Sequence, residues 1–147
     1  MRPKILIIED ELSLVELISY NLKKNGYDVD VANDGEAALD KIFGEVKYDL
    51  VLLDWMLPHI SGLELCRRIR KDKSTKNIPL IMITAKGEEE DKIRAFENEI
   101  DDYITKPFSQ KLLIERIRAV LRRSSYKNND VSDKLIKRND LSLDPDR

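Results

Sequence analysis

The chain contains three short runs of purely apolar residues, at positions 5–8, 50–53 and 80–83, and each run ends at a polar side chain. A strand with one face in water alternates apolar and polar residues, whereas a strand covered on both faces is apolar throughout. Runs of about four residues are also too short for buried helices. They therefore predict the inner strands of a parallel sheet.

Helical patterns separate these runs. The first helix is indicated by an apolar stripe at helical spacing, formed by Leu14, Leu17, Ile18 and Leu22. The spacing of Ser13 and Glu16 is typical of a capping box at its start, and Gly26 suits its C-terminal end. Two more strands are expected at 27–32 and 103–105, and four more helices at 36–43, 63–70, 88–98 and 109–123. The alternation predicts an α/β fold with a five-stranded parallel sheet between two layers of helices.

Composition narrows the class of protein. The chain has 147 residues, of which 41% are hydrophobic and 37% charged, and its net charge is −2. This balance argues against a nucleic-acid-binding surface on this part of the protein. No apolar stretch of about 18 residues and no signal-peptide pattern is present, so we expect neither membrane insertion nor secretion. A single cysteine, Cys66, fits a reducing, cytoplasmic location and is expected to pack against the sheet.

The polar residues that end the strands should meet. Asp54 follows one apolar run, the acidic residues Glu9-Asp10-Glu11 follow another, Thr84 follows a third, and Lys106 lies after the short last strand. In a parallel sheet all strands end at the same edge, which is where open α/β sheets bind ligands. Clustered carboxylates, a hydroxyl and an ammonium group suit a divalent cation together with a phosphoryl group.

Five stretches resemble the receiver domain of two-component response regulators. They are Ile7-Ile8-Glu9-Asp10-Glu11, Leu52-Leu53-Asp54-Trp55-Met56-Leu57-Pro58, Ser61-Gly62, Thr84-Ala85 and Lys106-Pro107-Phe108, and they cover about residues 3–123 in the family's order. The segments 84–91 and 101–109 are most similar to regulators of phosphate starvation in the OmpR/PhoB class. The resemblance implies a doubly wound (βα)5, flavodoxin-like and CheY-like fold.

The resemblance also implies a role for each polar residue. Asp54 would be the phosphoacceptor, with a sensor histidine kinase as the partner that supplies the phosphoryl group. Mg²⁺ would be held directly by Asp10 and Asp54, through water by Glu9, and by the backbone carbonyl of Met56. Lys106, before an expected cis bond to Pro107, would pair with Asp54 and later with the phosphoryl group. Thr84 and Tyr103 would be the switch residues.

On phosphorylation the family implies a symmetric homodimer through the fourth helix, fifth strand and fifth helix. The residues expected at that interface are Lys92, Ile93, Phe96, Asp101, Asp102, Arg116 and Arg123. The expected cross-interface pairs are Asp102 with Arg116 and Asp101 with Arg123. This chain departs from the family at Leu112 and Glu115, and at Glu99-Ile100, where relatives have Gly-Ala. The lost glycine predicts either a strained turn or a turn of another form.

The remaining residues suggest how the chain is divided. Residues 1–123 are expected to form the receiver domain, and the polar segment 124–138 a linker. Residues 139–147 resemble the first strand of a winged-helix DNA-binding domain. DNA would be bound only through that further domain.

Two other interpretations stay open. Phosphohydrolases also use an aspartate nucleophile, but they need a second carboxylate two residues later, where this chain has Met56. The other is a stand-alone receiver, or an interaction module that works without phosphorylation; the intact set of polar residues argues against the latter. In the loop after Asp54, His59 is expected to be solvated and Gly62 to adopt the left-handed conformation.

Overall fold

A computed structural model describes residues 2–85 and 99–133. Its five strands are β1 (Lys4–Ile8), β2 (Asp28–Ala32), β3 (Leu50–Asp54), β4 (Leu80–Ala85) and β5 (Asp102–Lys106). The described helices are α1 (Leu12–Lys24), α2 (Gly35–Ile42), α3 (Gly62–Lys71) and α5 (Gln110–Asp133). The predicted helix over 88–98 lies outside the described residues.

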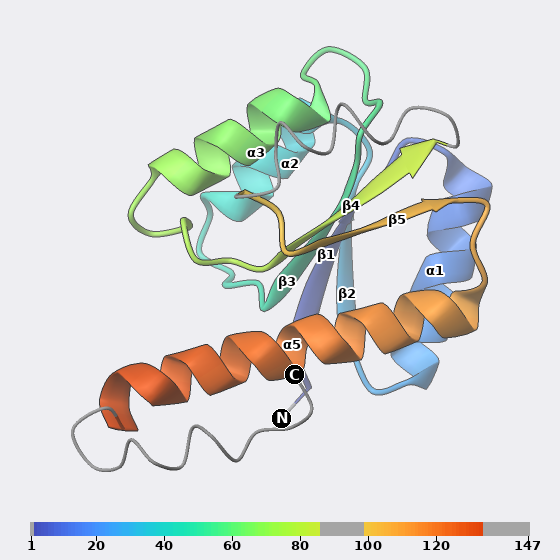
Figure 1. Ribbon diagram of the computed structural model, residues 1–147. Coiled ribbons are helices and arrows are strands. Elements are labelled where there is room, and N and C mark those ends of the chain that lie inside the picture. Colours follow the sequence, from blue (N-terminus) through green and yellow to red (C-terminus); the bar gives the residue numbers. More distant parts are fainter. Residues whose placement is uncertain (1, 86–98, 134–147) are drawn as a thin grey trace.

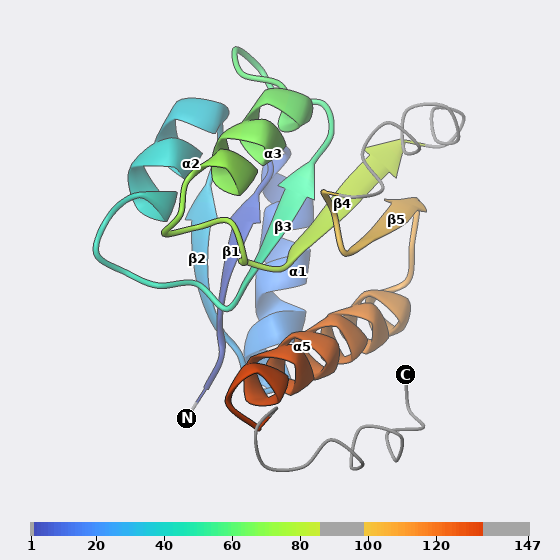
Figure 2. The ribbon, with the colours of Figure 1, turned by 60° about the vertical axis from the view of Figure 1, so that its left-hand side comes forward.

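All strand pairs are parallel, and the strand order is β2-β1-β3-β4-β5. The arrowheads of the strands consequently lie at one edge of the sheet (Figure 1, Figure 2). The predicted α/β class and five-stranded parallel sheet are confirmed. Strand β3 is buried along its whole length, as its unbroken apolar run predicts.

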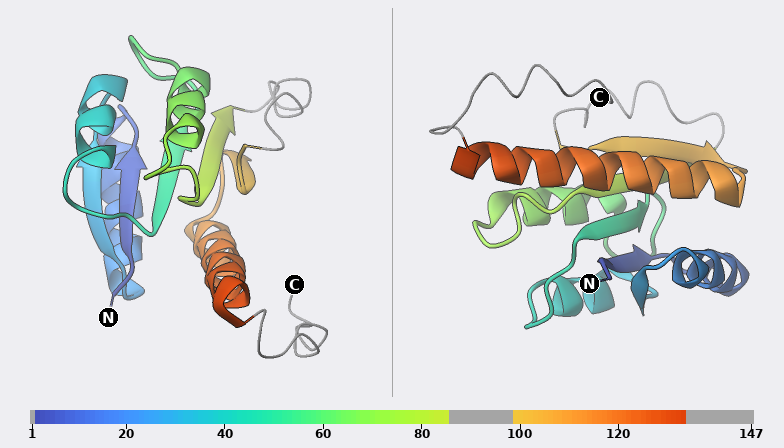
Figure 3. Two further views of the ribbon diagram at one scale, coloured as in Figure 1. Left: turned by 90° about the vertical axis from the view of Figure 1, so that its left-hand side faces the viewer. Right: turned by 90° about the horizontal axis from the view of Figure 1, so that it is seen from below.

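Two cores lie on opposite faces of the sheet, because alternate residues of each strand point to opposite sides. On one face Ile5 and Ile7 of β1 pack with residues of α1 and α5, such as Ile18 and Ile117. On the other face the neighbouring positions of the same strand pack with α2 and α3. Figure 3 shows these helix layers on either side of the sheet.

Two helix boundaries differ from the prediction by more than one residue. The helix α1 begins at Leu12, with Glu11 as its N-cap residue and no side-chain cap, so the predicted capping box at Ser13 is wrong. Ser13 lies inside the first turn because the chain becomes helical almost immediately after β1. At the other end, Gly26 has a φ of 95°, as a left-handed C-terminal cap requires.

The last helix, α5, continues to Asp133 rather than ending near Arg123. Residues 124–133 contain neither glycine nor proline, so no residue in this segment forces the helix to stop. Its last turns project beyond the sheet (Figure 1). The predicted division into receiver, linker and further domain stays a prediction. Among the described residues, none of the helices has the length and apolarity to cross a membrane.

Candidate functional site

Three carboxylates meet at the edge of the sheet where the strands end. Strands β1 and β3 are neighbours, with Ile8 opposite Leu53, so the residues that follow them are brought together. Glu9, Asp10 and Asp54 each place one carboxylate oxygen within 4.8 Å of the others. Glu9 is 0% exposed and Asp54 4% exposed, whereas Asp10 faces solvent. The predicted cluster is therefore present, with one side open to water.

Burial of like charges makes this cluster electrostatically unfavourable on its own. The pKa of Glu9 is raised to about 7, first by burial and then by the charge of Asp54. Burial also raises the pKa of Asp54, although the nearby Lys106 charge opposes that shift. In addition, Oε1 of Glu9 is buried without a hydrogen bond. A divalent cation would neutralise these charges, and an all-oxygen donor set of this kind fits Mg²⁺ or Ca²⁺.

Lys106 lies over the two buried carboxylates. Its Nζ is 3.5 Å from Oε1 of Glu9 and 3.7 Å from Oδ2 of Asp54. Lys106 is the last residue of β5, two strands away from β3, so its long side chain reaches across the end of β4. The bond between Lys106 and Pro107 is cis, as the family resemblance implies.

The two candidate switch residues lie at different depths. Thr84 is 3% exposed near the end of β4, and its hydroxyl is 3.4 Å from the hydroxyl of Thr105 on the neighbouring strand. Tyr103, in β5, is 38% exposed, so its ring is on the surface rather than in the core. Their movement on activation stays a prediction.

The loop between β3 and α3 has a tightly constrained backbone. The amide of Met56 donates to Oδ1 of Asp54 at 3.2 Å, and the Met56 residue is 59% exposed. His59 is exposed, as predicted, but it also has a φ of 69°. Gly62 does not adopt the predicted left-handed conformation. It is needed for a different reason: a Cβ at this position would lie 2.9 Å from the carbonyl oxygen of Asp54.

Four of the charged residues expected at a dimer interface, Asp101, Asp102, Arg116 and Arg123, already have partners within the chain. Asp102 binds Arg116 at 2.7 Å, and Arg123 donates to the backbone oxygen of Asp101 at 3.3 Å. The carboxylate of Asp101 instead accepts from the Leu80 amide at 2.8 Å and from Arg70. The cross-interface pair of Asp101 with Arg123 would therefore require these contacts to be exchanged. Lys92, Ile93 and Phe96 lie outside the described residues.

Arg70 is a structural residue that the sequence did not reveal. Its guanidinium donates to the carbonyl oxygens of Glu99, Lys76 and Ile78 at 2.7, 2.8 and 2.7 Å, and to Asp101 at 3.2 Å. These bonds join the segment before β4, at Lys76 and Ile78, to the turn before β5, at Glu99 and Asp101. Glu99, where relatives have glycine, has no positive φ, so the turn takes another form rather than a strained left-handed one.

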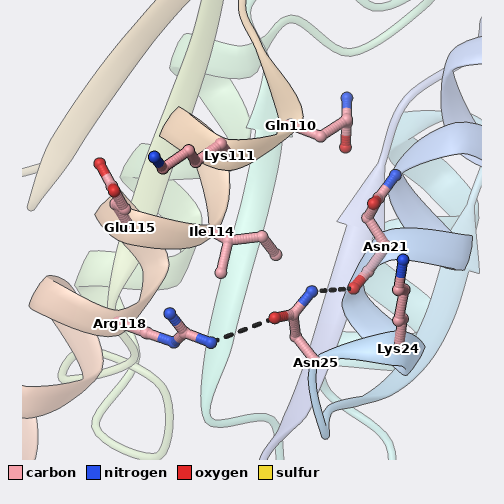
Figure 4. A pocket seen from close by; sticks show the side chains of 8 residues that line it. All are labelled: Asn21, Lys24, Asn25, Gln110, Lys111, Ile114, Glu115 and Arg118. Atoms are coloured by element: carbon pink, nitrogen blue, oxygen red, sulfur yellow. Dashed lines mark hydrogen bonds between the residues drawn. The ribbon is translucent and has the colours of Figure 1, made fainter.

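A groove of about 340 Å³ lies between α1 and α5 (Figure 4). Arg118 of α5 donates to the Oδ1 of Asn25 at 3.1 Å, and Asn25 donates to the backbone oxygen of Asn21 at 2.7 Å. None of the groove's lining residues belongs to the acidic cluster. These bonds connect the C-terminal end of α1 with α5 on the surface.

Comparison with known proteins identifies relatives over nearly the whole chain. A family described as the response regulator receiver domain matches residues 5–118. The phosphate regulon transcriptional regulatory protein PhoB of Escherichia coli is 43% identical over 145 residues, which are 99% of this chain and 62% of that protein. The alkaline phosphatase synthesis transcriptional regulatory protein PhoP of Bacillus subtilis is 45% identical, with the same coverage of 99% and 62%. The chain thus spans 62% of the length of these relatives.

Solved structures share the fold. The receiver domain of the Francisella response regulator 1452 is 36% identical, with a TM-score of 0.75, covering 84% of this chain and 99% of that one. The receiver domain of the sensor histidine kinase PA1611 from Pseudomonas aeruginosa is 27% identical, with a TM-score of 0.74, covering 82% and 98%. That structure has a magnesium ion coordinated in its active-site cleft.

Proposed function

The chain belongs to the response regulator receiver family, and on that premise we propose that Asp54 accepts a phosphoryl group that switches the protein between two signalling states. The observation that carries the proposal is the set of charges around Asp54. Two further carboxylates provide oxygen atoms within 4.8 Å, and the ammonium group of Lys106 lies 3.7 Å from its Oδ2. Acidic and basic groups held this closely at a strand end are better suited to phosphoryl transfer than to a purely structural role.

Mg²⁺ would be held by Asp10 and Asp54, with Glu9 acting through water and the Met56 carbonyl adding a backbone oxygen. The ion would supply the charge neutralisation that phosphoryl transfer requires. Oε1 of Glu9 is buried and lies 3.5 Å from the Lys106 ammonium without accepting a hydrogen bond. This and the raised pKa of Glu9 both favour a further cation at the site. Asp10, on the exposed side, leaves the site open to solvent and to a phosphoryl donor.

In the proposed reaction a carboxylate oxygen of Asp54 attacks the phosphorus of a phosphohistidine on a partner sensor kinase. The new bond joins phosphorus to oxygen, the bond from phosphorus to the histidine nitrogen breaks, and the histidine keeps that electron pair. Lys106 already lies beside Asp54 and can contact a phosphoryl oxygen with a small movement of its flexible side chain. The Thr84 hydroxyl would donate to another phosphoryl oxygen.

The proposed output is a change on the surface that includes β5 and α5. Movement of Thr84 would leave space for the exposed ring of Tyr103 to turn inward. That change would favour a homodimer using Asp102, Arg116 and Arg123, with Lys92, Ile93, Phe96 and Asp101 as further candidates. DNA binding would then depend on a further domain, as the transcriptional role in the names of PhoB and PhoP suggests. The same names make phosphate regulation the proposed physiological context.

Incubation with acetyl phosphate tests the proposal, with intact mass as the measurement. The wild type should gain one phosphoryl group in the presence of Mg²⁺ and none in excess EDTA. Asp54→Asn keeps the size of the side chain and removes the nucleophile, so it should gain none. Equal labelling of Asp54→Asn would show that another residue accepts the group. Absence of labelling in the wild type would favour an interaction module that works without phosphorylation.

A further inference from the structure

The segment 33–35, which comprises the turn after β2 and the first residue of α2, touches both segments that carry the candidate metal ligands. None of its three residues belongs to the acidic cluster. On one side, Nδ2 of Asn33 donates to the backbone oxygen of Glu9 at 3.3 Å, and the Glu9 amide donates to the oxygen of Ala32 at 3.1 Å. The start of the turn thus holds the backbone from which the Glu9 side chain projects.

On the other side, Gly35 packs against the loop between β3 and α3. A Cβ atom built on Gly35 would lie 2.6 Å from the Cβ of Ile60 and 3.3 Å from its Cγ1 and Cγ2. Real Cβ atoms do not approach this closely, so Ile60 rests directly on a bare stretch of backbone. The turn itself is fixed, because Asp34 caps α2 by accepting from the Ala37 amide at 2.8 Å.

The loop that Ile60 anchors also carries Met56, whose carbonyl is a candidate metal ligand. Beside Ile60, His59 has a φ of 69° and the Ile60 amide donates to the Pro58 oxygen at 2.8 Å, which is a tight turn of rarely used geometry. At its far end the loop is held by Gly62, which allows close approach to the Asp54 carbonyl. A backbone constrained in this way needs neighbours that hold it in place.

We propose that Asn33 and Gly35 are positioning residues for the metal site: Asn33 holds the Glu9 backbone, and Gly35 seats Ile60 and thereby orients the loop that carries the Met56 carbonyl. The inference rests on the proposed function only in requiring that the acidic cluster binds Mg²⁺. Replacing residues that orient metal ligands without touching the metal commonly lowers the affinity for the metal by about 10–100-fold.

The test is the dissociation constant for Mg²⁺, measured by titrating the fluorescence of Trp55 in the same loop. Gly35→Ala should push Ile60 away and raise the Kd by about tenfold. Gly44→Ala is the control just beyond the opposite end of α2, because its Cβ would also meet a close neighbour, the Asp40 oxygen at 3.0 Å, but away from the loop that carries Met56. Its Kd should stay within about twofold of the wild type.

Thermal unfolding in EDTA separates positioning from general destabilisation. If Gly35 acts through the loop, Gly35→Ala and Gly44→Ala can lose similar stability, yet only the first should lose affinity for Mg²⁺. Ile60→Ala and Asn33→Ala give second routes, since each removes one contact without adding bulk, and each should also raise the Kd. If the wild type binds Mg²⁺ and the variants Gly35→Ala, Ile60→Ala and Asn33→Ala all bind it with the same affinity, this inference is overturned and the proposed metal site is not. A wild type that does not bind Mg²⁺ would overturn the proposed metal site as well.

Discussion

Replacing Arg70 with methionine should destabilise the protein by about 3 kcal/mol. The substitution keeps most of the apolar stem of the side chain but removes all four hydrogen bonds of the guanidinium. Each of the three bonds to backbone carbonyls should contribute about 1 kcal/mol. The donor is charged, which strengthens the bond, but water can partly replace the lost donor at each carbonyl oxygen. The ion pair with Asp101, in which the side chains are 19% and 31% exposed, should add at most about 1 kcal/mol.

Urea unfolding followed by circular dichroism measures this difference, and the thermal midpoint should fall by roughly 10 °C. Arg68→Met is the matched control on the same helix, since among the described residues Arg68 pairs only with Glu64, and the two side chains are 48% and 47% exposed. It should cost no more than about 0.5 kcal/mol. A loss below about 1 kcal/mol for Arg70→Met, or equal losses for the two variants, would refute the role assigned to Arg70.

Three further predictions concern the interface, pH and the loop. Light scattering with beryllofluoride and Mg²⁺ should show dimers for the wild type. Arg116→Glu should weaken them by about tenfold, because the proposed pair of Arg116 with Asp102 of the other protomer would become a repulsion. Equal dimerisation would contradict the proposed interface. Burial alone would raise the pKa of Asp30, but hydrogen bonds from Tyr48, at 2.6 Å, and Lys4 hold it below its ordinary value. The wild type should therefore be more stable than Tyr48→Phe by about 1 kcal/mol near pH 7. This difference should shrink as the pH falls through the lowered pKa of Asp30, because the hydrogen bond to the charged carboxylate is then lost. A difference that stays unchanged down to pH 2 would be evidence against this role of Tyr48. His59→Gly should raise stability by about 0.5 kcal/mol in thermal unfolding, because glycine accepts a φ of 69° without strain, and a loss of stability would argue that the His59 side chain makes contacts of its own.

The inner strands and the acidic cluster could be predicted because both follow from one physical requirement. A strand covered on both faces must be apolar throughout, so the point where the run becomes polar marks the exposed edge of the sheet. Once β1 and β3 are neighbours, the carboxylates of Glu9 and Asp54 have to meet. The same reasoning brings Lys106 to this edge, although its distance from Asp54 depends on the path of a long flexible side chain.

The features that escaped prediction depend on contacts between distant backbone groups. Arg70 lies in a run of basic residues that looks like a solvated helix face, and its partners are mostly carbonyl oxygens, which leave no mark in a sequence. The family resemblance predicts an interface role for Asp101, but it does not reveal that the Asp101 carboxylate binds the first amide of β4. The end of α5 could not be predicted because residues 124–133 are mostly polar, a composition that is compatible with a helix as well as with a linker.

The central claim is that Asp54 itself carries the phosphoryl group, and it can be tested by trapping that group chemically. Borohydride reduces an aspartyl phosphate to homoserine, so a protein treated with acetyl phosphate and Mg²⁺, reduced and digested should contain homoserine at position 54. Peptide mass spectrometry would locate it. Homoserine at position 54, absent when Mg²⁺ is withheld, is the predicted result. Homoserine at Asp10 or at any other aspartate, with position 54 unmodified, would contradict the account.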